Sequence, residues 1–351
     1  MRFPTPLRKL FVLLALVAAS VSTAQAKDKV TFAITTYGWS YVPVLTAAQL
    51  GFYEQEGLDV EIINTGGGAK AQAALAGGSV DLYGSDAGFA IKARSKGSEV
   101  TLVGASMTEY ATNIVVSGAW AKKNGITTAS SYQDKLRAMK GITIGVLSRG
   151  SGHEQLVRFL AKEAKLDADR DLTITAMGTA AATIAAFEQG RITAFVHSAP
   201  IGERAVKDFG GVMMFNMSKG DVVPLQGFLY TAYVARESWI KSHEDVLVRF
   251  LRSQQRALNA LHDPVQTKKA RDALHAAYFS TLEPAFWNFV WDSNISAFPK
   301  TVEVTAKQMK QAVALIEEFQ TERIPASAVD ASWTNTYAQR AAQQLAAPGG
   351  K

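Results

Sequence analysis

The stretch LDVEIINTGGGAKAQAALAGGSVDLYGSDAG, residues 58–88, carries the pattern that decides the fold. A short apolar run, a glycine turn, an alanine-rich segment and a second apolar run predict a strand, a helix and another strand. Turns at 64–68 and 84–87 directly follow the two predicted strands. In an open parallel sheet, the turns after the carboxyl ends of strands hold the ligand, so we expect both turns to line a binding site.

The same pattern occurs again 112 residues later, without a gap, in LTITAMGTAAATIAAFEQGRITAFVHSAP at 172–200. Glycines and apolar positions stay in phase, as in the correspondence of Gly66 with Gly178. The strand that precedes each stretch is in phase as well. Two copies of one βαβαβ unit, at about 30–87 and 142–199, therefore predict an α/β protein with two lobes.

Two stretches, near 106–114 and 220–227, are expected to carry the chain to the second lobe and back. We therefore assign residues 27–108 and 225–351 to lobe I and residues 109–224 to lobe II. The chain after the return has few strand signals, and its helices should pack on lobe I. These helices are predicted at about 237–261, 265–278, 283–294, 301–318 and 332–345.

In the first unit, Ser40 is expected to cap a helix that has Pro43 in its first turn and ends at Gly51. Residues 52–57 are then expected to form a turn, and the return strand is expected at 228–234.

The first 26 residues form a signal peptide, with positive residues, then a short apolar run, then the cleavage site Ala24-Gln25-Ala26. That run is too short to span a bilayer, which takes about 20 apolar residues. The chain has no cysteine, which excludes disulfides, thiol catalysis, thiolate metal sites and a lipid anchor. We expect a soluble periplasmic protein without a lipid anchor.

The net charge of +6 includes three positive residues of the signal peptide, and the rest of the chain has no basic cluster. A nucleic-acid partner is therefore not expected. The glycine turn 66–71 followed by Asp86 resembles a dinucleotide fingerprint, but it follows the second strand of its unit and its copy lacks the glycines. Neither a cofactor nor a metal is expected, because no two histidines have metal-ligand spacing.

Several side chains in the predicted turns have two open interpretations. Tyr37, Trp39 and Tyr41 share one turn and could form a wall for a flat ligand or pack in the core. His153 and His197 both follow strand ends and could contact a ligand or serve local structure.

Arg149 could pair with a carboxylate or sulfonate, or could be an exposed cation. Asp86 could cap the next helix or bind an amine. A serine triad assembled from Ser85, His153 or His197 is also left open, although the chain has no G-x-S-x-G motif.

The segments GWSYVP at 38–43 and GFYEQEGLDV at 51–60 resemble the substrate-binding proteins of ABC importers in the nitrate, taurine, aliphatic sulfonate and thiamine-precursor group. The segment GGSVDLYGSDA at 77–87 and the glycine–serine turn Gly150-Ser151 are similar to that group too. The resemblance implies a type II periplasmic binding fold, in which two lobes close on a ligand and then dock on an inner-membrane permease. It also implies a ligand between the turns after the strands.

From the turns and the resemblance together, we expect a monomeric receptor for a small organic anion, such as a sulfonate or an aromatic carboxylate. The alternatives are an exported hydrolase and a protein that binds or makes a pyrimidine precursor. The eukaryotic enzymes of that group use a cysteine-rich motif, which this chain lacks. The residues expected at the ligand are Tyr37, Trp39, Tyr41, Gly67, Gly68, Ser85, Asp86, Tyr110, Arg149, Ser151, His153, Thr179 and His197.

Overall fold

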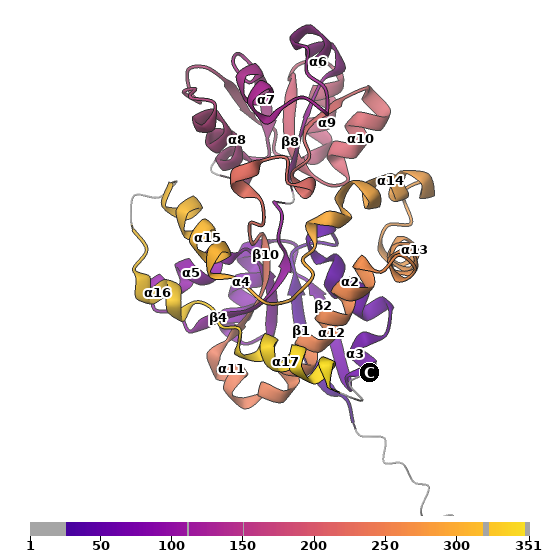
Figure 1. Cartoon of the computed structure of the whole chain (residues 1–351), viewed down its shortest axis with the longest axis vertical. Helices are drawn as coiled ribbons and strands as arrows, with labels where there is room; N and C mark the ends of the chain where they lie inside the picture. The colour runs from indigo at the N-terminus through magenta and orange to yellow at the C-terminus, as the bar shows by residue number, and fades with distance from the viewer. Residues whose placement is uncertain (1–25, 111, 150, 319–322, 348–351) are drawn as a thin grey trace, which may run out of the picture.

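The chain forms two α/β bodies stacked along its long axis, as the computed structural model shows (Figure 1). The structure describes residues 26–110, 112–149, 151–318 and 323–347. The predicted signal peptide lies outside the described residues apart from Ala26, and Gly150 of the predicted glycine–serine turn lies outside them as well.

Each body is built on a mixed five-stranded sheet. The lobe I sheet has the order β2 (Leu58–Asn64), β1 (Asp28–Ile34), β3 (Leu82–Ser85), β10 (Thr231–Arg236) and β4 (Val100–Met107). The lobe II sheet has the order β7 (Thr173–Ala176), β6 (Thr143–Val146), β8 (Ala194–Ser198), β5 (Thr112–Val116) and β9 (Val212–Phe215). In both sheets the fourth strand runs antiparallel to its neighbours and the first three are parallel.

The pairing registers confirm the predicted repeat. Phe32 pairs with Leu82 in lobe I, and Ile144 pairs with Ala194 in lobe II, so both partners shift by the same 112 positions. The backbone N–H of Thr65 donates to Ile34 at 2.9 Å, and the N–H at the equivalent position 177 donates to Val146 at 2.8 Å. The two units therefore share their strand register as well as their order of elements.

The two lobes exchange a strand. After β4 the chain enters the other sheet as β5, between β8 and β9, and after β9 it returns as β10, between β3 and β4. The division near residues 108 and 225 stays a prediction.

Helices cover both faces of the two sheets (Figure 1). In lobe II these are α6 (Gly118–Asn124), α7 (Tyr132–Ala138), α8 (Gly152–Glu163), α9 (Ala180–Glu188) and α10 (Ile201–Phe209). The lobe I sheet is covered by α2 (Val42–Gln49), α3 (Phe52–Gln55), α4 (Gly68–Gly77), α5 (Ala87–Ser95), α11 (Glu237–Ser242), α12 (Glu244–His262), α13 (Gln266–Tyr278), α15 (Ala306–Glu318), α16 (Ala326–Ala331) and α17 (Thr336–Ala346).

One C-terminal helix, α14 (Pro284–Asn294), contacts both lobes. Its Trp291 packs against Trp39 of lobe I, with ring centroids 5.6 Å apart. On the other side, Asn294 Nδ2 donates to the buried Glu203 Oε1 of α10 at 2.7 Å. Thus α14 adds a link between the lobes that the sequence did not indicate.

Four local predictions were wrong. Ser40 does not cap α2, because residues 39–41 form a 3₁₀ turn and Tyr41 takes the N-cap position without a side-chain bond. Residues 52–55 form the short helix α3 and not a turn. The return strand begins at Thr231, because 223–225 form another 3₁₀ turn and the chain reaches the sheet late.

The helix predicted from residue 301 begins only at Ala306. Thr305 and Gln308 form a capping box: the N–H of Thr305 donates to Gln308 Oε1 at 2.8 Å, and the N–H of Gln308 donates to Thr305 Oγ1 at 3.2 Å. The short helix α16 was not predicted. Among the described residues, no helix combines the length and apolar character needed to cross a membrane.

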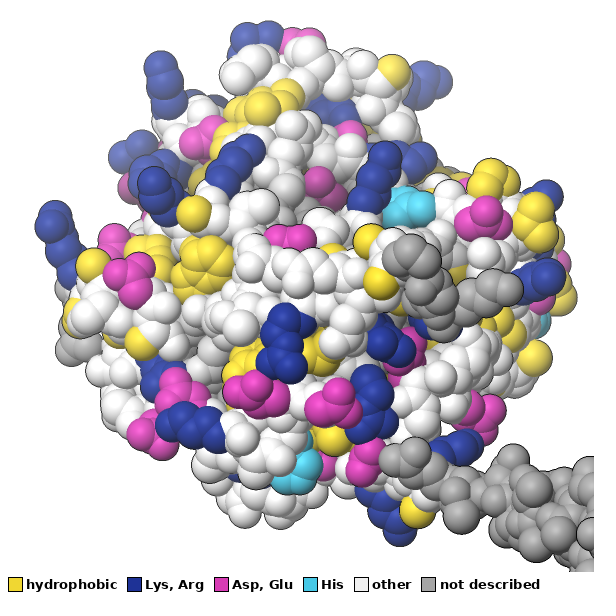
Figure 2. Space-filling model, turned by 60° about the horizontal axis from the view of Figure 1, so that its bottom comes forward, with side chains coloured by type: hydrophobic (Ala, Val, Ile, Leu, Met, Phe, Trp, Pro, Cys, Tyr) yellow, Lys and Arg dark blue, Asp and Glu magenta, His cyan; other side chains and the backbone are white. Residues whose placement is uncertain are grey.

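One face of the molecule carries side chains of both charges. On the face seen in Figure 2, lysine and arginine side chains of the described residues are interspersed with aspartate and glutamate.

We predict that Phe32→Ala lowers the free energy of unfolding by about 3–5 kcal/mol, because Phe32 is fully buried and packs between Phe250 and Tyr233. Phe289→Ala is the control, since that side chain is 40% exposed and should change stability little. Urea denaturation of both variants tests this. Equal losses in the two would contradict the assigned core.

Candidate ligand-binding cleft

A cavity of about 790 Å³ lies where the carboxyl ends of the parallel strands meet the crossings between the lobes. Residues 35–41 follow β1, residues 84–86 end β3, and residues 197–201 end β8 and begin α10. Parallel strands gather the turns after their ends at one edge of a sheet, and here the two sheets bring their edges together. The volume is in the range of sites for drug-sized ligands.

Two of the three aromatic side chains in the turn after β1 are buried in the core. Trp39 is 4% exposed and packs against Trp291 and Phe298. Tyr41 is 5% exposed and its hydroxyl donates to the carbonyl oxygen of Gly84 at 3.0 Å. Tyr37 is 41% exposed, so it is the member of the turn with most surface available to a ligand.

All three aromatic residues line the cavity. Outside it, Tyr37 stacks on Tyr278, with ring centroids 5.0 Å apart. This contact holds the exposed ring in place at the rim of the cleft.

A second aromatic group, which we call the crossing cluster, consists of Tyr110, Phe228 and Tyr230. The Tyr110 ring centroid lies 5.0 Å from that of Tyr230 and 5.6 Å from that of Phe228, and all three residues line the cavity. The Tyr110 hydroxyl donates to the carbonyl oxygen of Gly152 at 3.2 Å. Burial raises the pKa of Tyr110 and Tyr230, so both phenols stay neutral.

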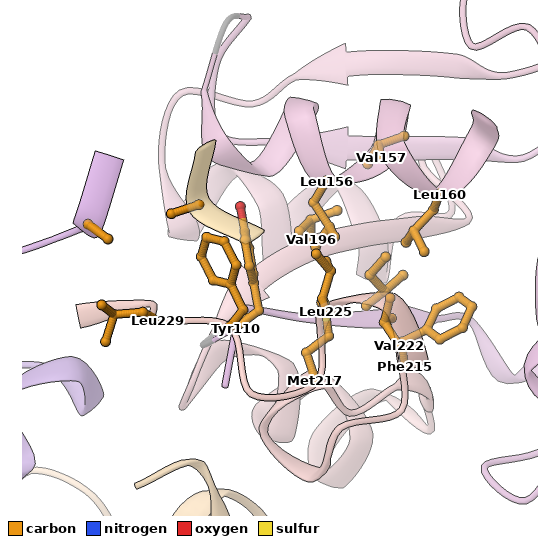
Figure 3. Close-up of a cluster of buried hydrophobic side chains, with 14 of the residues drawn as sticks. Tyr110, Leu156, Val157, Leu160, Val196, Phe215, Met217, Val222, Leu225 and Leu229 are labelled. Atoms are coloured by element: carbon orange, nitrogen blue, oxygen red, sulfur yellow. The ribbon is translucent and has the colours of Figure 1, made fainter. Parts of the chain in front are cut away.

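The crossing cluster rests on the core of lobe II. In Figure 3, Tyr110 lies in one buried cluster with Leu225 and Leu229 of the second crossing and with Leu156 of α8. Sequence reasoning proposed Tyr110 and missed Phe228 and Tyr230. Both had been placed in the predicted return strand, which in the structure begins only at Thr231.

The small polar residues of the turns act mainly as helix caps. Asp86 Oδ1 accepts from the N–H of Phe89 at 3.0 Å, Ser151 caps α8, and Thr179 caps α9. Ser85 and Asp86 line the cavity, whereas Ser151 and Thr179 are not among its lining residues. Asp86 makes no ion pair with any described residue, so its carboxylate keeps acceptor capacity at the cleft.

The glycine turn and Arg149 lie outside the lining of the cavity. Gly67 and Gly68 begin α4 and are not among the lining residues. Arg149 Nη1 pairs with Glu154 Oε1 at 2.9 Å, and Nη2 donates to the carbonyl oxygen of Ile174 at 2.6 Å. The guanidinium is therefore engaged within lobe II.

The two histidines lie together, with ring centroids 5.4 Å apart. His197 lines the cavity, and its Nδ1 lies 3.3 Å from the carbonyl oxygen of Ser198, which requires the proton on that nitrogen. Burial lowers the pKa of both, and burial together with the neighbouring His197 ring brings the pKa of His153 to about 4. Both rings are therefore neutral at pH 7.

No hydrogen bond joins Ser85 to either histidine within the described part of the chain, so the geometry gives a serine triad no support. The described residues also contain no group of three or more metal-ligating side chains.

The lining includes residues that the sequence did not suggest: Tyr83 of β3, Lys92 of α5, and Ala312, Leu315 and Ile316 of α15. The three α15 residues reach the cavity because α15 packs on α5, a contact between segments more than 200 residues apart.

A family model described as the NMT1-like family matches residues 24–276. The chain belongs to the NMT1-like family. A relative in Bacillus subtilis (strain 168), named "Putative binding protein YtlA", is 25% identical to this NMT1-like protein over 256 residues, which cover 70% of the chain and 69% of the relative.

The 4-amino-5-hydroxymethyl-2-methylpyrimidine phosphate synthase of Schizosaccharomyces pombe (strain 972 / ATCC 24843) is 27% identical over 248 residues, covering 69% of the chain and 68% of that enzyme. The structure of the periplasmic aliphatic sulphonate binding protein SsuA from Escherichia coli superposes with a TM-score of 0.66 at 19% identity, over 88% of this chain and 99% of that one. The NMT1-like chain thus has the periplasmic binding protein fold, as the sequence predicted.

We predict a pH-dependent contribution to stability from Glu109. Its Oε1 accepts from the N–H of Gly227 at 3.0 Å, which joins the two crossings, and burial raises the pKa of Glu109 to about 7. The unfolded carboxyl ionises near pH 4.5, so unfolding releases a proton between pH 4.5 and 7. The contribution of this group to stability is therefore fully present below pH 4.5 and is lost as the pH rises through 7.

The measurement compares the wild-type protein with Glu109→Gln by melting between pH 5 and 8. The wild-type melting temperature should fall relative to that of the variant as pH rises. Parallel pH profiles for the two proteins would show that Glu109 titrates normally.

Proposed function

We propose that this NMT1-like protein is the periplasmic solute receptor of an ABC importer and binds a small organic anion with a flat body. The observation that carries the proposal is the cavity between the two sheets, with the crossing cluster at its wall. Support comes from the fold that the chain shares with the sulphonate-binding protein of E. coli and from its similarity to the B. subtilis relative. The size of the cavity favours an organic solute over an inorganic ion.

In this proposal the ligand is bound and released unchanged. The lobes close about the two crossings, which brings the residues of lobe I and lobe II onto opposite sides of the ligand and excludes water. The closed monomer then docks on an inner-membrane permease. We also propose that the protein is exported, is cleaved near residue 26 and carries no lipid anchor.

A second candidate is binding of an amino-substituted pyrimidine. The S. pombe relative is named as an enzyme of pyrimidine phosphate synthesis. Asp86 favours this candidate, because its carboxylate lies at the cleft without an ion pair to any described residue and could accept from a ring amino group.

The test is a melting-temperature screen of the mature protein with sulfonates, nitrate, aromatic carboxylates, aminopyrimidines and amino acids. A ligand at about 100 times its Kd should add about 2.7 kcal/mol of stability and raise the melting temperature by several degrees. Calorimetry should then give one ligand per chain, and mass spectrometry should recover it unchanged. A product that differs from the added ligand would contradict a receptor.

We predict that Tyr37→Ala weakens binding of the best ligand about 10-fold, because loss of one aromatic contact costs about 1.4 kcal/mol. Phe289→Ala is a matched control: its side chain is 40% exposed, as Tyr37 is 41% exposed, but it does not line the cavity. Calorimetry on both variants measures the two Kd values. An unchanged Kd for Tyr37→Ala would remove Tyr37 from the site.

A further inference from the structure

The positive charge that faces the cavity comes from Lys92. Among the described residues that line the cavity, it is the sole lysine or arginine. The cation that the sequence suggested, Arg149, is held by Glu154 and by the carbonyl oxygen of Ile174. An anionic ligand in this cavity therefore meets a lysine of lobe I and not an arginine of lobe II.

Lys92 has no carboxylate partner in the described part of the chain, whereas two other cations on α5 and α8 do. Arg94 on the same helix pairs with Glu237, and Lys162 of α8 pairs with Glu318 of α15 at 2.9 Å. Lys92 is partly buried at the cavity wall. A partly desolvated ammonium without a partner gains more from an incoming anion than a paired one does.

The position of Lys92 places this charge at one end of the cavity. Gly88 and Lys92 are four residues apart on α5 and lie on the same helix face. A Cβ atom at Gly88 would lie 3.3 Å from Ile316 Cδ1, so this face of α5 lies directly against α15. Leu315 and Ile316 of α15 line the same end of the cavity and lower the local dielectric around the ammonium.

The other end of the cavity is formed by different elements. His197, Pro200 and Ile201 line it at the start of α10. In Figure 1, α5 and α15 lie on one side of the molecule, and α10 and α14 lie on the other. The two crossings, which carry the crossing cluster, run between these sides, and we infer a cavity with a charged end and an aromatic middle.

We propose that Lys92 binds the acidic group of the ligand, and that the ligand is an elongated aryl or heteroaryl carboxylate or sulfonate whose ring lies against the crossing cluster. This inference rests on the proposed receptor function and adds the orientation of the ligand and the residue that selects for its charge. Asp86 also lines the cavity, and its carboxylate would repel a second acidic group on the ligand.

The experiment uses three acids of increasing length, benzoate, 3-phenylpropanoate and 5-phenylpentanoate, each with its uncharged amide. Melting shifts and calorimetry are measured for the wild-type mature protein and for Lys92→Gln, Lys92→Arg and Lys96→Gln. Lys96 is the matched control, because it lies on the same helix end, is exposed and does not line the cavity.

For the wild-type protein we expect at least one acid to bind 10-fold or more tightly than its amide, with an affinity that falls as salt is raised. Lys92→Gln should abolish this preference and flatten the salt dependence, Lys92→Arg should keep part of it, and Lys96→Gln should keep all of it. All variants should melt within a degree or two of the wild-type protein without ligand, because Lys92 makes no ion pair with described residues.

Three results would overturn the proposal, and they distinguish failure of the Lys92 assignment from failure of the ligand class. If Lys92→Gln retains the preference for the acid, or if the wild-type protein binds acid and amide equally, Lys92 does not select the ligand while the receptor function stands. If none of the six compounds binds the wild-type protein, the proposed class of aromatic anions fails, and this inference fails with it.

Discussion

The exchange of one strand between the two sheets is the constraint on which the rest of the structure depends. Strand β5 completes the lobe II sheet although it follows β4 of lobe I, and β10 completes the lobe I sheet although it follows β9 of lobe II. In lobe I, β10 pairs with β4, and in lobe II, β5 pairs with β9, so the lobe I sheet is complete only after the chain has passed through lobe II and returned. The crossings that lead to these strands must therefore run together between the lobes.

This constraint explains where the cleft lies and what forms its wall. The ends of β1, β3 and β8 supply the turns, and the two crossings supply Tyr110, Phe228 and Tyr230. The aromatic cluster packs the two crossings against each other, since Tyr110 of the first contacts Phe228 and Tyr230 of the second. The link between Glu109 and Gly227 and the contacts of α14 with both lobes add to this shared support.

Much of the fold could be predicted because it is encoded by local patterns and by a repeat. Residues close in sequence determine the strands, which coincide with the apolar runs, and the turns that follow them. The same local patterns make the two units equivalent. The family fold was predicted from GWSYVP and GFYEQEGLDV. Ser40 was misassigned because the burial of Trp39 and Tyr41 favours a 3₁₀ turn, a tertiary effect that a capping rule does not contain.

The candidate site could be predicted less completely. Residues in turns after strands, such as Tyr37, Asp86 and His197, were found because topology alone brings them to the cleft. Phe228, Tyr230 and Lys92 were missed because their positions depend on contacts between distant segments, including α5 against α15. Arg149 was proposed from its charge, but a partner five residues away, Glu154, holds its guanidinium.

The central claim is that the ligand binds between the lobes and closes them. Small-angle scattering of the mature protein, alone and saturated with the solute that gives the largest melting shift, tests this most directly. The account predicts that the radius of gyration falls on binding and returns when the solute is dialysed away. An unchanged radius of gyration at full occupancy would contradict closure of the two lobes.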